Sequence, residues 1–240
     1  MTLIFHPSNS RGHANHGWLE ANHSFSFAAY YDPSKTNFGA LRVLNDDKIA
    51  PSMGFGTHPH DNMEIITVPL FGVLKHKDSM SNEWLKVEAG EVQVMSAGTG
   101  VFHSEMNASS TEDLKLFQIW ISPNLHGVAP RYDQRHYEQA PTRELQLLVE
   151  SIDDFKLETS LKINQNAQIS RINLNPNDRF TYYLKSEAHG VYVMQVFGIS
   201  TIGNHKLQQR DAVGVSNATQ FLIEAQQESQ LLFIEVPMVF

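Results

Sequence analysis

Short segments rich in Val, Ile, Phe, Tyr and Trp recur along the chain between clusters of Gly, Asn, Asp and Pro, and this pattern limits its possible folds most. The segments 40–47 (ALRVLNDD) and 114–123 (LKLFQIWISP) show the composition and spacing of strands that end at turns. Apolar residues at helical spacing are scarce. The sequence therefore predicts an all-β protein.

The strand-like segments fall into two halves of similar length. Between them, residues 123–141 (PNLHGVAPRYDQRHYEQAP) hold three prolines and little apolar pattern, which is typical of a connector at the surface. Strand-like segments then resume, among them RFTYYLK, GVYVMQVFGIS and SQLLFIEVP. We therefore expect two β units, each of the length of a sandwich or small barrel.

Composition excludes several classes of protein. The net charge of −8 argues against a nucleic-acid groove or a site for anionic membranes, because both need clustered Lys and Arg. The absence of cysteine excludes disulfides and a thiol nucleophile. No apolar run approaches the roughly 20 residues of a membrane helix, and the first residues do not resemble a signal peptide. We expect a cytoplasmic protein.

Two pairs of polar residues in the first half share one spacing. His58 and His60 are two residues apart in one segment, and His103 and Glu105 are two apart in another. Side chains two apart on a strand point to the same face, so the members of each pair project together. Glu64 would join the first pair if the strand continues without a break beyond His60.

The surroundings of these pairs favour a metal ion. Apolar neighbours such as Phe55, Ile65 and Val101 indicate that both pairs lie within folded structure. Burying three imidazoles and a carboxylate together is costly without a compensating cation. With no cysteine in the chain, imidazole and carboxylate ligands suit Fe, Cu, Ni, Mn or Zn. The alternative is a set of exposed polar residues whose spacing is accidental.

Several segments carry a family resemblance: HGWLEANHSFSFAAYYDP, FGALRVLNDD, GFGTHPHDNMEII, HKDS, VQVMSAGTGVFHSEMN and FQIWISP. They cover residues 12–123 almost continuously and resemble the pirin family of the cupin superfamily, in its bacterial branch described as quercetin 2,3-dioxygenases. The resemblance implies a bicupin of two jelly-roll β-barrels. The expected domains are a metal-binding one at residues 1–130 and a degenerate one without a metal site at residues 131–240.

The resemblance also implies a ligand set, which is His58, His60, His103 and Glu105. Glu64 then lies outside the set as a supporting group. The expected cofactor is one divalent transition ion, Fe(II) first, with Mn, Co, Ni, Cu or Zn as alternatives, and a closed zinc site is the structural alternative. One departure is Asp61, because the family usually has Arg after His-Pro-His.

The implied activity is that of a dioxygenase that opens the ring of a quercetin-like flavonol with O2 and releases CO. In this reaction Glu105 would act as the general base. Two alternatives stay open: a non-enzymatic, metal-bearing redox sensor or transcriptional co-regulator, and a metal-free sugar-binding or isomerase cupin. The sequence indicates neither the native metal, nor the physiological substrate, nor the oligomeric state.

Other residues of the first half fit structural roles. Surface or turn positions are expected for three histidines: His13, His16 and His23. The mouth or core of the barrel is expected for three aromatic residues: Trp18, Phe25 and Phe27. His76 and Asp78 fit a turn between strands, since Asp bonds local backbone groups.

Overall fold

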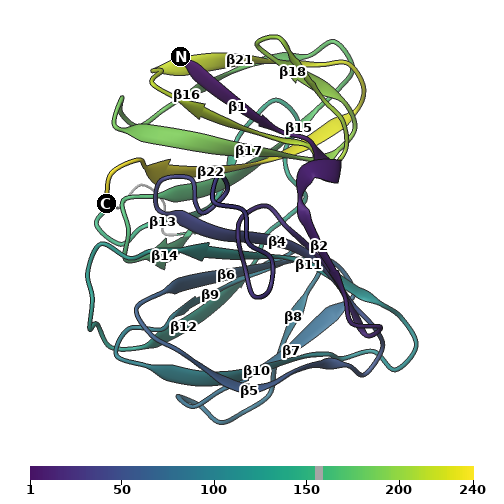
Figure 1. The fold of residues 1–240 in the computed structure, drawn as a ribbon, viewed down its shortest axis with the longest axis vertical. Helices are drawn as coiled ribbons and strands as arrows, with labels where there is room; N and C mark the ends of the chain where they lie inside the picture. The colour runs from purple at the N-terminus through teal and green to yellow at the C-terminus, as the bar shows by residue number, and fades with distance from the viewer. Residues whose placement is uncertain (155–158) are drawn as a thin grey trace.

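The computed structural model describes residues 1–154 and 159–240, which form two stacked β units (Figure 1). Each unit consists of a seven-stranded and a four-stranded sheet in a jelly-roll-like arrangement. The one helix among the described residues is a 3-10 turn, η1 (Ser8–Ser10), and no described helix could span a membrane. The prediction of an all-β fold is confirmed.

The first unit, lower in Figure 1, contains two antiparallel sheets. In spatial order, its seven-stranded sheet runs β12 (Arg131–His136), β9 (Glu91–Ser96), β6 (Glu64–Phe71), β11 (Leu114–Ile121), β4 (Leu41–Ile49), β3 (Leu19–His23) and β2 (Gly12–Asn15). Its four-stranded sheet runs β5 (Gly54–His60), β10 (Val101–Asn107), β7 (Val73–Asp78) and β8 (Leu85–Glu88).

The second unit repeats this pairing of a large and a small sheet. Its seven-stranded sheet runs β1 (Thr2–His6), β20 (Ala212–Ser216), β17 (His189–Phe197), β22 (Ser229–Pro237), β15 (Gln168–Leu174), β13 (Gln146–Ser151) and β14 (Leu161–Ile163). Its four-stranded sheet runs β16 (Arg179–Tyr183), β21 (Gln220–Ala225), β18 (Ser200–Ile202) and β19 (His205–Leu207).

The two units exchange strands at their edges. The first strand of the chain, β1, pairs with β20 of the second unit. The strand β12, which follows the expected boundary at residue 130, pairs with β9 of the first unit. The division at residues 130 and 131 stays a prediction about which parts fold as units.

The largest apolar core lies between the two seven-stranded sheets. Alternation along β11 sends Phe117 and Ile119 into this core, where they join residues such as Tyr192 and Ile234 of the second unit. The other face of β11 carries Gln118, which points into the first unit. The central strand β11 is therefore buried on both faces, one against the other unit and one within its own.

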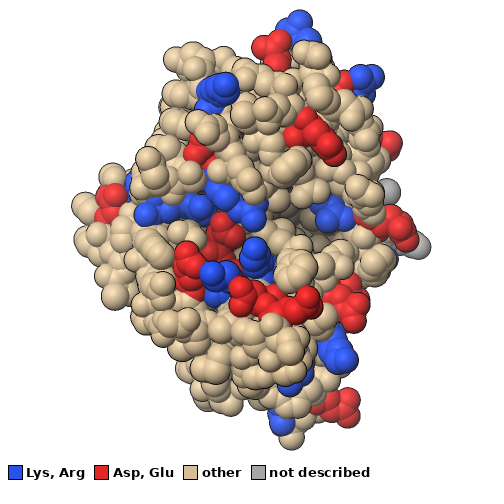
Figure 2. Space-filling view, turned by 90° about the vertical axis from the view of Figure 1, so that its right-hand side faces the viewer, with Lys and Arg blue, Asp and Glu red and all other residues tan. Residues whose placement is uncertain are grey.

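Ion pairs supplement this apolar contact. Asp46 on β4 accepts hydrogen bonds from Arg11 and Arg210, at 3.4 and 3.0 Å, and Arg210 also lies over the ring of Phe117. Figure 2 shows charged side chains of both signs gathered in a band across the middle of one face. The two units are thus held together by a broad apolar contact and by buried or half-buried charge pairs.

Candidate metal centre

The antiparallel pair of β5 and β10 brings the two histidine-containing segments together. His103 is the register partner of His58, and Glu105 is the partner of Phe55, so β5 has one more residue than β10 between these pairs. Such a bulge re-aims side chains locally. Gly54 permits the close approach of the strands, because a Cβ there would lie 2.1 Å from the carbonyl oxygen of Glu105.

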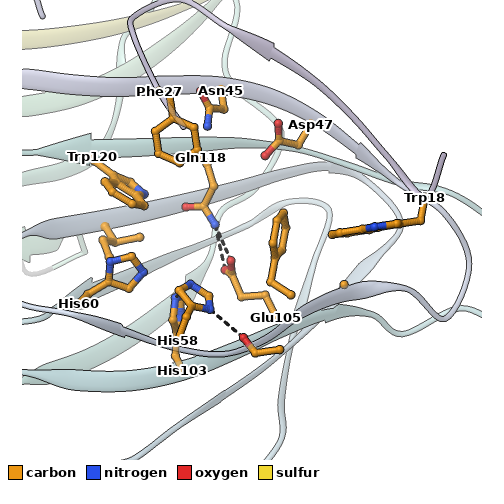
Figure 3. Close-up of a pocket in the computed structure, with 14 residues that line it drawn as sticks. Trp18, Phe27, Asn45, Asp47, His58, His60, His103, Glu105, Gln118 and Trp120 are labelled. Carbon is orange, nitrogen blue, oxygen red and sulfur yellow. Dashed lines mark hydrogen bonds between the residues drawn. The ribbon is translucent and has the colours of Figure 1, made fainter. Parts of the chain in front are cut away.

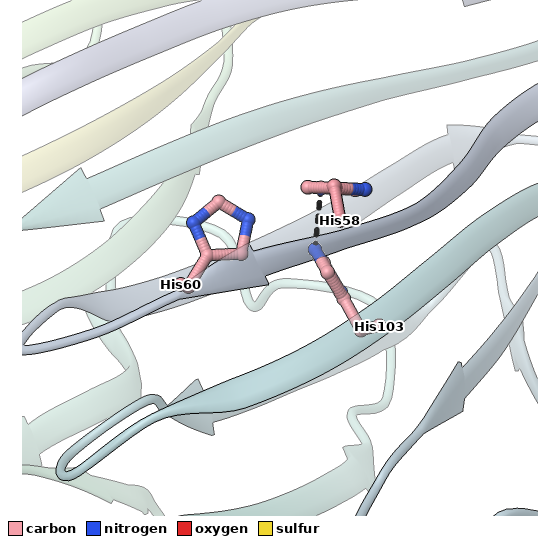
Figure 4. Close-up of side chains that lie close together, drawn as sticks. All are labelled: His58, His60 and His103. Atoms are coloured by element: carbon pink, nitrogen blue, oxygen red, sulfur yellow. Dashed lines mark hydrogen bonds between the residues drawn. The ribbon is translucent and has the colours of Figure 1, made fainter.

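Three imidazoles converge from these strands (Figure 4). One ring nitrogen from each of His58, His60 and His103 lies within 4.8 Å of the others. His58 donates a hydrogen bond from Nδ1 to the carbonyl oxygen of Gly56 at 2.8 Å, which leaves a lone pair on its Nε2. That Nε2 faces the Nε2 of His103 at 2.9 Å, so two potential ligand atoms point at each other.

Two of the remaining ring nitrogens lack hydrogen-bond partners. His60 Nε2 and His103 Nδ1 are buried and have no hydrogen-bond partner among the described residues. Burial, and to a lesser extent the neighbouring His58, lowers the pKa of His60 to about 4 and that of His103 to about 2. At neutral pH both rings are therefore uncharged and keep the lone pair that a metal ion needs.

Glu105 lies beside the three imidazoles with its carboxylate buried. Both carboxylate oxygens accept hydrogen bonds from Gln118 Nε2, at 2.9 and 2.8 Å, and Thr67 donates in turn to Gln118 Oε1. Burial raises the pKa of Glu105 to about 7, although the bond from Gln118 opposes the shift. One carboxylate oxygen lies within 4.8 Å of a ring nitrogen of His103, in a group that also includes His76.

His76 is a buried neighbour that does not offer a free ligand atom. Its Nε2 bonds Asp78 at 3.1 Å, and its Nδ1 accepts a hydrogen bond from Gln93 at 3.2 Å. Its ring also stacks on Tyr132. Since both of its nitrogens have partners, the group formed by His58, His60 and His103 is the better metal site. Asp78 does stabilise a turn, because it accepts from the backbone amides of residues 80 and 81.

Glu64 does not share a face with the first histidine pair. β5 ends at His60, a turn with Asn62 at φ 42° follows, and β6 begins at Glu64 in the other sheet of the unit. The buried carboxylate of Glu64 accepts hydrogen bonds from Ser96 and from Asn164 of the second half, at 2.6 and 2.9 Å. The condition of an unbroken strand is therefore not met, and Glu64 supports the contact between the units instead.

The histidines lie on the wall of a cavity of about 480 Å³ inside the first unit (Figure 3). Aromatic side chains dominate its lining: Trp18, Phe27, Phe55 and Trp120. Trp120 packs edge to face against both His60 and Phe27, with ring centroids 4.8 and 5.3 Å apart. Apolar walls with a few polar groups are typical of a site for a small molecule.

The opposite wall carries polar residues that the sequence pattern did not indicate. Asn45 and Asp47, two apart on β4, line the cavity together with Gln118. The expected surface position of His23 was wrong, because this residue is buried and its Nδ1 donates to Asn45 Oδ1 at 2.8 Å. His13 and His16 are exposed, as expected, and Asp61 is exposed in the turn after His60.

These residues fit a divalent metal ion. Ligands bound at about 2.1 Å lie at most about 4.2 Å apart, so the 4.8 Å spread of the three imidazoles needs only small rotations. A cation would also give a partner to the buried Nε2 of His60 and would separate the two Nε2 atoms of His58 and His103, which face each other. His58, His60 and His103 would hold it, and the neighbouring carboxylate of Glu105 is the available oxygen donor.

Two jelly-roll-like units, one of them with a cluster of three histidines in a cavity, define a two-domain cupin with a candidate metal centre. The pirin family model matches residues 4–121, and the model described as the quercetinase C-terminal cupin domain matches residues 148–236. The chain belongs to the pirin family.

Relatives of known name or structure cover the whole chain. A protein of Escherichia coli K12 named quercetin 2,3-dioxygenase is 44% identical over 99% of this chain and 100% of its own. A pirin-like protein of Caulobacter vibrioides is 37% identical over 95% of this chain and 97% of its own. The crystal structure of the E. coli pirin YhhW in complex with nickel(II) superposes with a TM-score of 0.92, at 42% identity over 99% and 100% of the two chains.

Proposed function

We propose that the protein is a metal-dependent dioxygenase that opens the ring of a quercetin-like flavonol. The observation that carries the proposal is the cluster of three imidazoles, with Glu105 beside them, on the wall of an aromatic cavity. Relatives at 41–44% identity named for quercetin 2,3-dioxygenase activity support it. The overall reaction consumes one O2 per flavonol and yields a depside and one CO.

The proposed ligands are His58, His60, His103 and Glu105. The nickel(II) complex of the E. coli pirin supports a divalent transition ion, and Fe(II) is our expectation for the native metal. The chemistry supplied by such an ion is a lower pKa for a substrate hydroxyl and a route for electrons to O2. The open positions left by three imidazoles and one carboxylate suit substrate binding better than a closed structural site does.

The protein's own residues bind and orient the substrate. Trp18 and Phe55, which meet edge to face at 5.1 Å, and Phe27 with Trp120 form apolar walls that exclude water from the flavonol rings. These walls leave the edge with the 3-hydroxyl and the 4-carbonyl to face the imidazoles. Glu105 takes the 3-hydroxyl proton onto a carboxylate oxygen, and Gln118 holds that carboxylate in position.

The test is spectrophotometric. Protein loaded separately with Fe, Mn, Co, Ni or Cu is mixed with quercetin in air, and the flavonol absorbance band and CO release are followed. We expect the band to decay with at least one metal, with one CO released per flavonol consumed. A stable band with every metal would contradict the proposal and, with a metal still bound, would favour the redox-sensor alternative.

A further inference from the structure

The wall of the cavity opposite the histidines holds a carboxyl group that the proposed reaction does not use. Asp47 is 4% exposed, lines the cavity, and its Oδ1 has no hydrogen-bond partner in the described parts of the chain. A buried polar atom without a partner destabilises a fold by roughly 1–3 kcal/mol. The presence of such an unpaired carboxyl group on a cavity wall indicates that a ligand binds it.

The neighbouring carboxylate, Asp46, differs from Asp47 because it has charged partners. Asp46, on the other face of β4, is bonded by Arg11 and Arg210. Asp47 faces the cavity instead, where burial and the carboxylates of Asp46 and Glu105 raise its pKa to about 8. A protonated carboxyl group both donates and accepts a hydrogen bond, as a hydroxyl partner requires.

Asn45 extends this polar wall. It precedes Asp47 by two residues on the same face of β4, about 7 Å along the strand. Because its amide oxygen accepts from His23, its NH2 group remains for the cavity. Asn45 is the register partner of Gln118, which holds Glu105, so this wall continues from the candidate metal centre to Asp47.

We propose that Asp47 and Asn45 form a polar anchor that binds a phenolic hydroxyl of the substrate remote from its metal-binding edge. Figure 3 shows the two side chains on the upper wall of the cavity and the three imidazoles on the lower wall, with Gln118 and Glu105 between them. A flat polyphenol can lie between aromatic walls with one oxygen-bearing edge at each end. The anchor selects polyhydroxylated flavonols over those that carry only the 3-hydroxyl.

The proposal rests on the proposed function for its substrate class, so its test measures binding rather than turnover. Nickel-loaded, full-length protein is titrated under argon with 3-hydroxyflavone, galangin and quercetin, which carry increasing numbers of remote hydroxyls. Quenching of Trp fluorescence reports binding, because Trp18 and Trp120 line the cavity. We expect the best polyhydroxylated ligand to bind about tenfold more tightly than 3-hydroxyflavone, which is the effect of one hydrogen bond.

Two variants assign this preference to Asp47. Asp47→Leu removes both polar atoms and should abolish the preference, so that the three flavonols bind this variant with equal affinity. Asp47→Asn keeps a donor and an acceptor and should retain most of the preference. Asp133→Asn, which changes an exposed carboxylate on β12, is the matched control and should behave as the wild type.

Equal affinities of the wild type for the three ligands would overturn the anchor even if no variant folds. An undiminished preference in Asp47→Leu would overturn it as well. If flavonols bind with this preference but are never consumed in air, the proposed function fails and the anchor stands. If they are consumed without the preference, the anchor fails and the proposed function stands.

Discussion

The interiors of the two units differ far more than the arrangement of their sheets does. Both pair a seven-stranded with a four-stranded sheet, and β11 and β22 are the central strands of the two large sheets. Between the sheets of the second unit lies one continuous apolar cluster, which includes Val193, Val213 and Phe233. The first unit has two small apolar clusters instead, and its cavity is lined by residues from both.

This difference indicates that the two units have separate roles: the second contributes stability, and the first carries the candidate site. The large apolar contact between the units and the filled interior of the second unit supply burial, which is the main stabilising term in folding. The inner faces of β4, β5, β10 and β11 can then carry polar groups that weaken the first unit's own core. We infer that the second unit acts as a support that lets the first one stay hollow.

The largest effect is expected at His60, in the first unit. We expect His60→Ala to abolish quercetin consumption and to lower metal affinity by more than about 100-fold, because changes to groups that only support a ligand already cost about 10–100-fold. Metal per chain and the initial rate are measured together. His205→Ala in the second unit, which only loses a ring stacked on Phe5, should keep both values. Full metal content in His60→Ala would contradict its assignment as a ligand.

A second comparison uses one buried carboxylate from each unit. Glu105→Gln should lower the rate per bound metal about 10²–10⁴-fold, as expected for loss of a general base. Glu235 is equally buried, and it accepts hydrogen bonds from Tyr182 and Gln168 in the second unit. Glu235→Gln should change the stability but leave the rate per bound metal within about twofold. Equal losses in the two variants would mean that Glu105 acts on the fold and not on the reaction.

A polar side chain in the apolar interior of the second unit should destabilise the protein. Val193→Asn places an amide in the apolar cluster of the second unit and should lower the free energy of unfolding by about 3 kcal/mol. Val193→Ala separates the loss of packing from the burial of the amide. Urea unfolding followed by circular dichroism gives both values. A polar variant as stable as the Ala variant would show that the second unit also has room for a site.

The smallest effect concerns pH and Asp47. Its pKa is raised from 3.8 to about 8, so the folded state holds this proton over a range in which the unfolded state has lost it. The contribution of the group to stability therefore falls as pH rises from about 4 to 8. Relative to the wild type, Asp47→Asn should gain about 2 kcal/mol between pH 5 and 7, measured by urea unfolding of the metal-free proteins. A difference that does not change with pH would place Asp47 in contact with water.

The histidine pairs could be found from sequence because a strand fixes their geometry. Residues two apart share a face, so His58 with His60 and His103 with Glu105 were visible as pairs, and the structure brings them together across β5 and β10. The same rule does not hold for Glu64, because a three-residue turn after His60 carries the chain into the other sheet. A local pattern cannot show where a strand ends and the next sheet begins.

The opposite wall could not be predicted for a related reason. Asn45 and Asp47 lie in the segment LRVLNDDKI and resembled the turn at the end of a strand, whereas β4 continues through them to Ile49. Their role depends on the register that sets Asn45 beside Gln118 and on the sheet that faces β10. Both are long-range features, set by how the sheets pack rather than by the neighbours of a residue along the chain.

We expect that the hollow first unit holds one metal ion and that the filled second unit holds none. Anomalous diffraction at the absorption edge of the loaded metal, on crystals of the full chain, tests it directly. We predict one peak per chain, about 2.1 Å from a ring nitrogen of each of His58, His60 and His103. A peak in the second unit, or none beside these three imidazoles in metal-loaded protein, would contradict this assignment of the metal site.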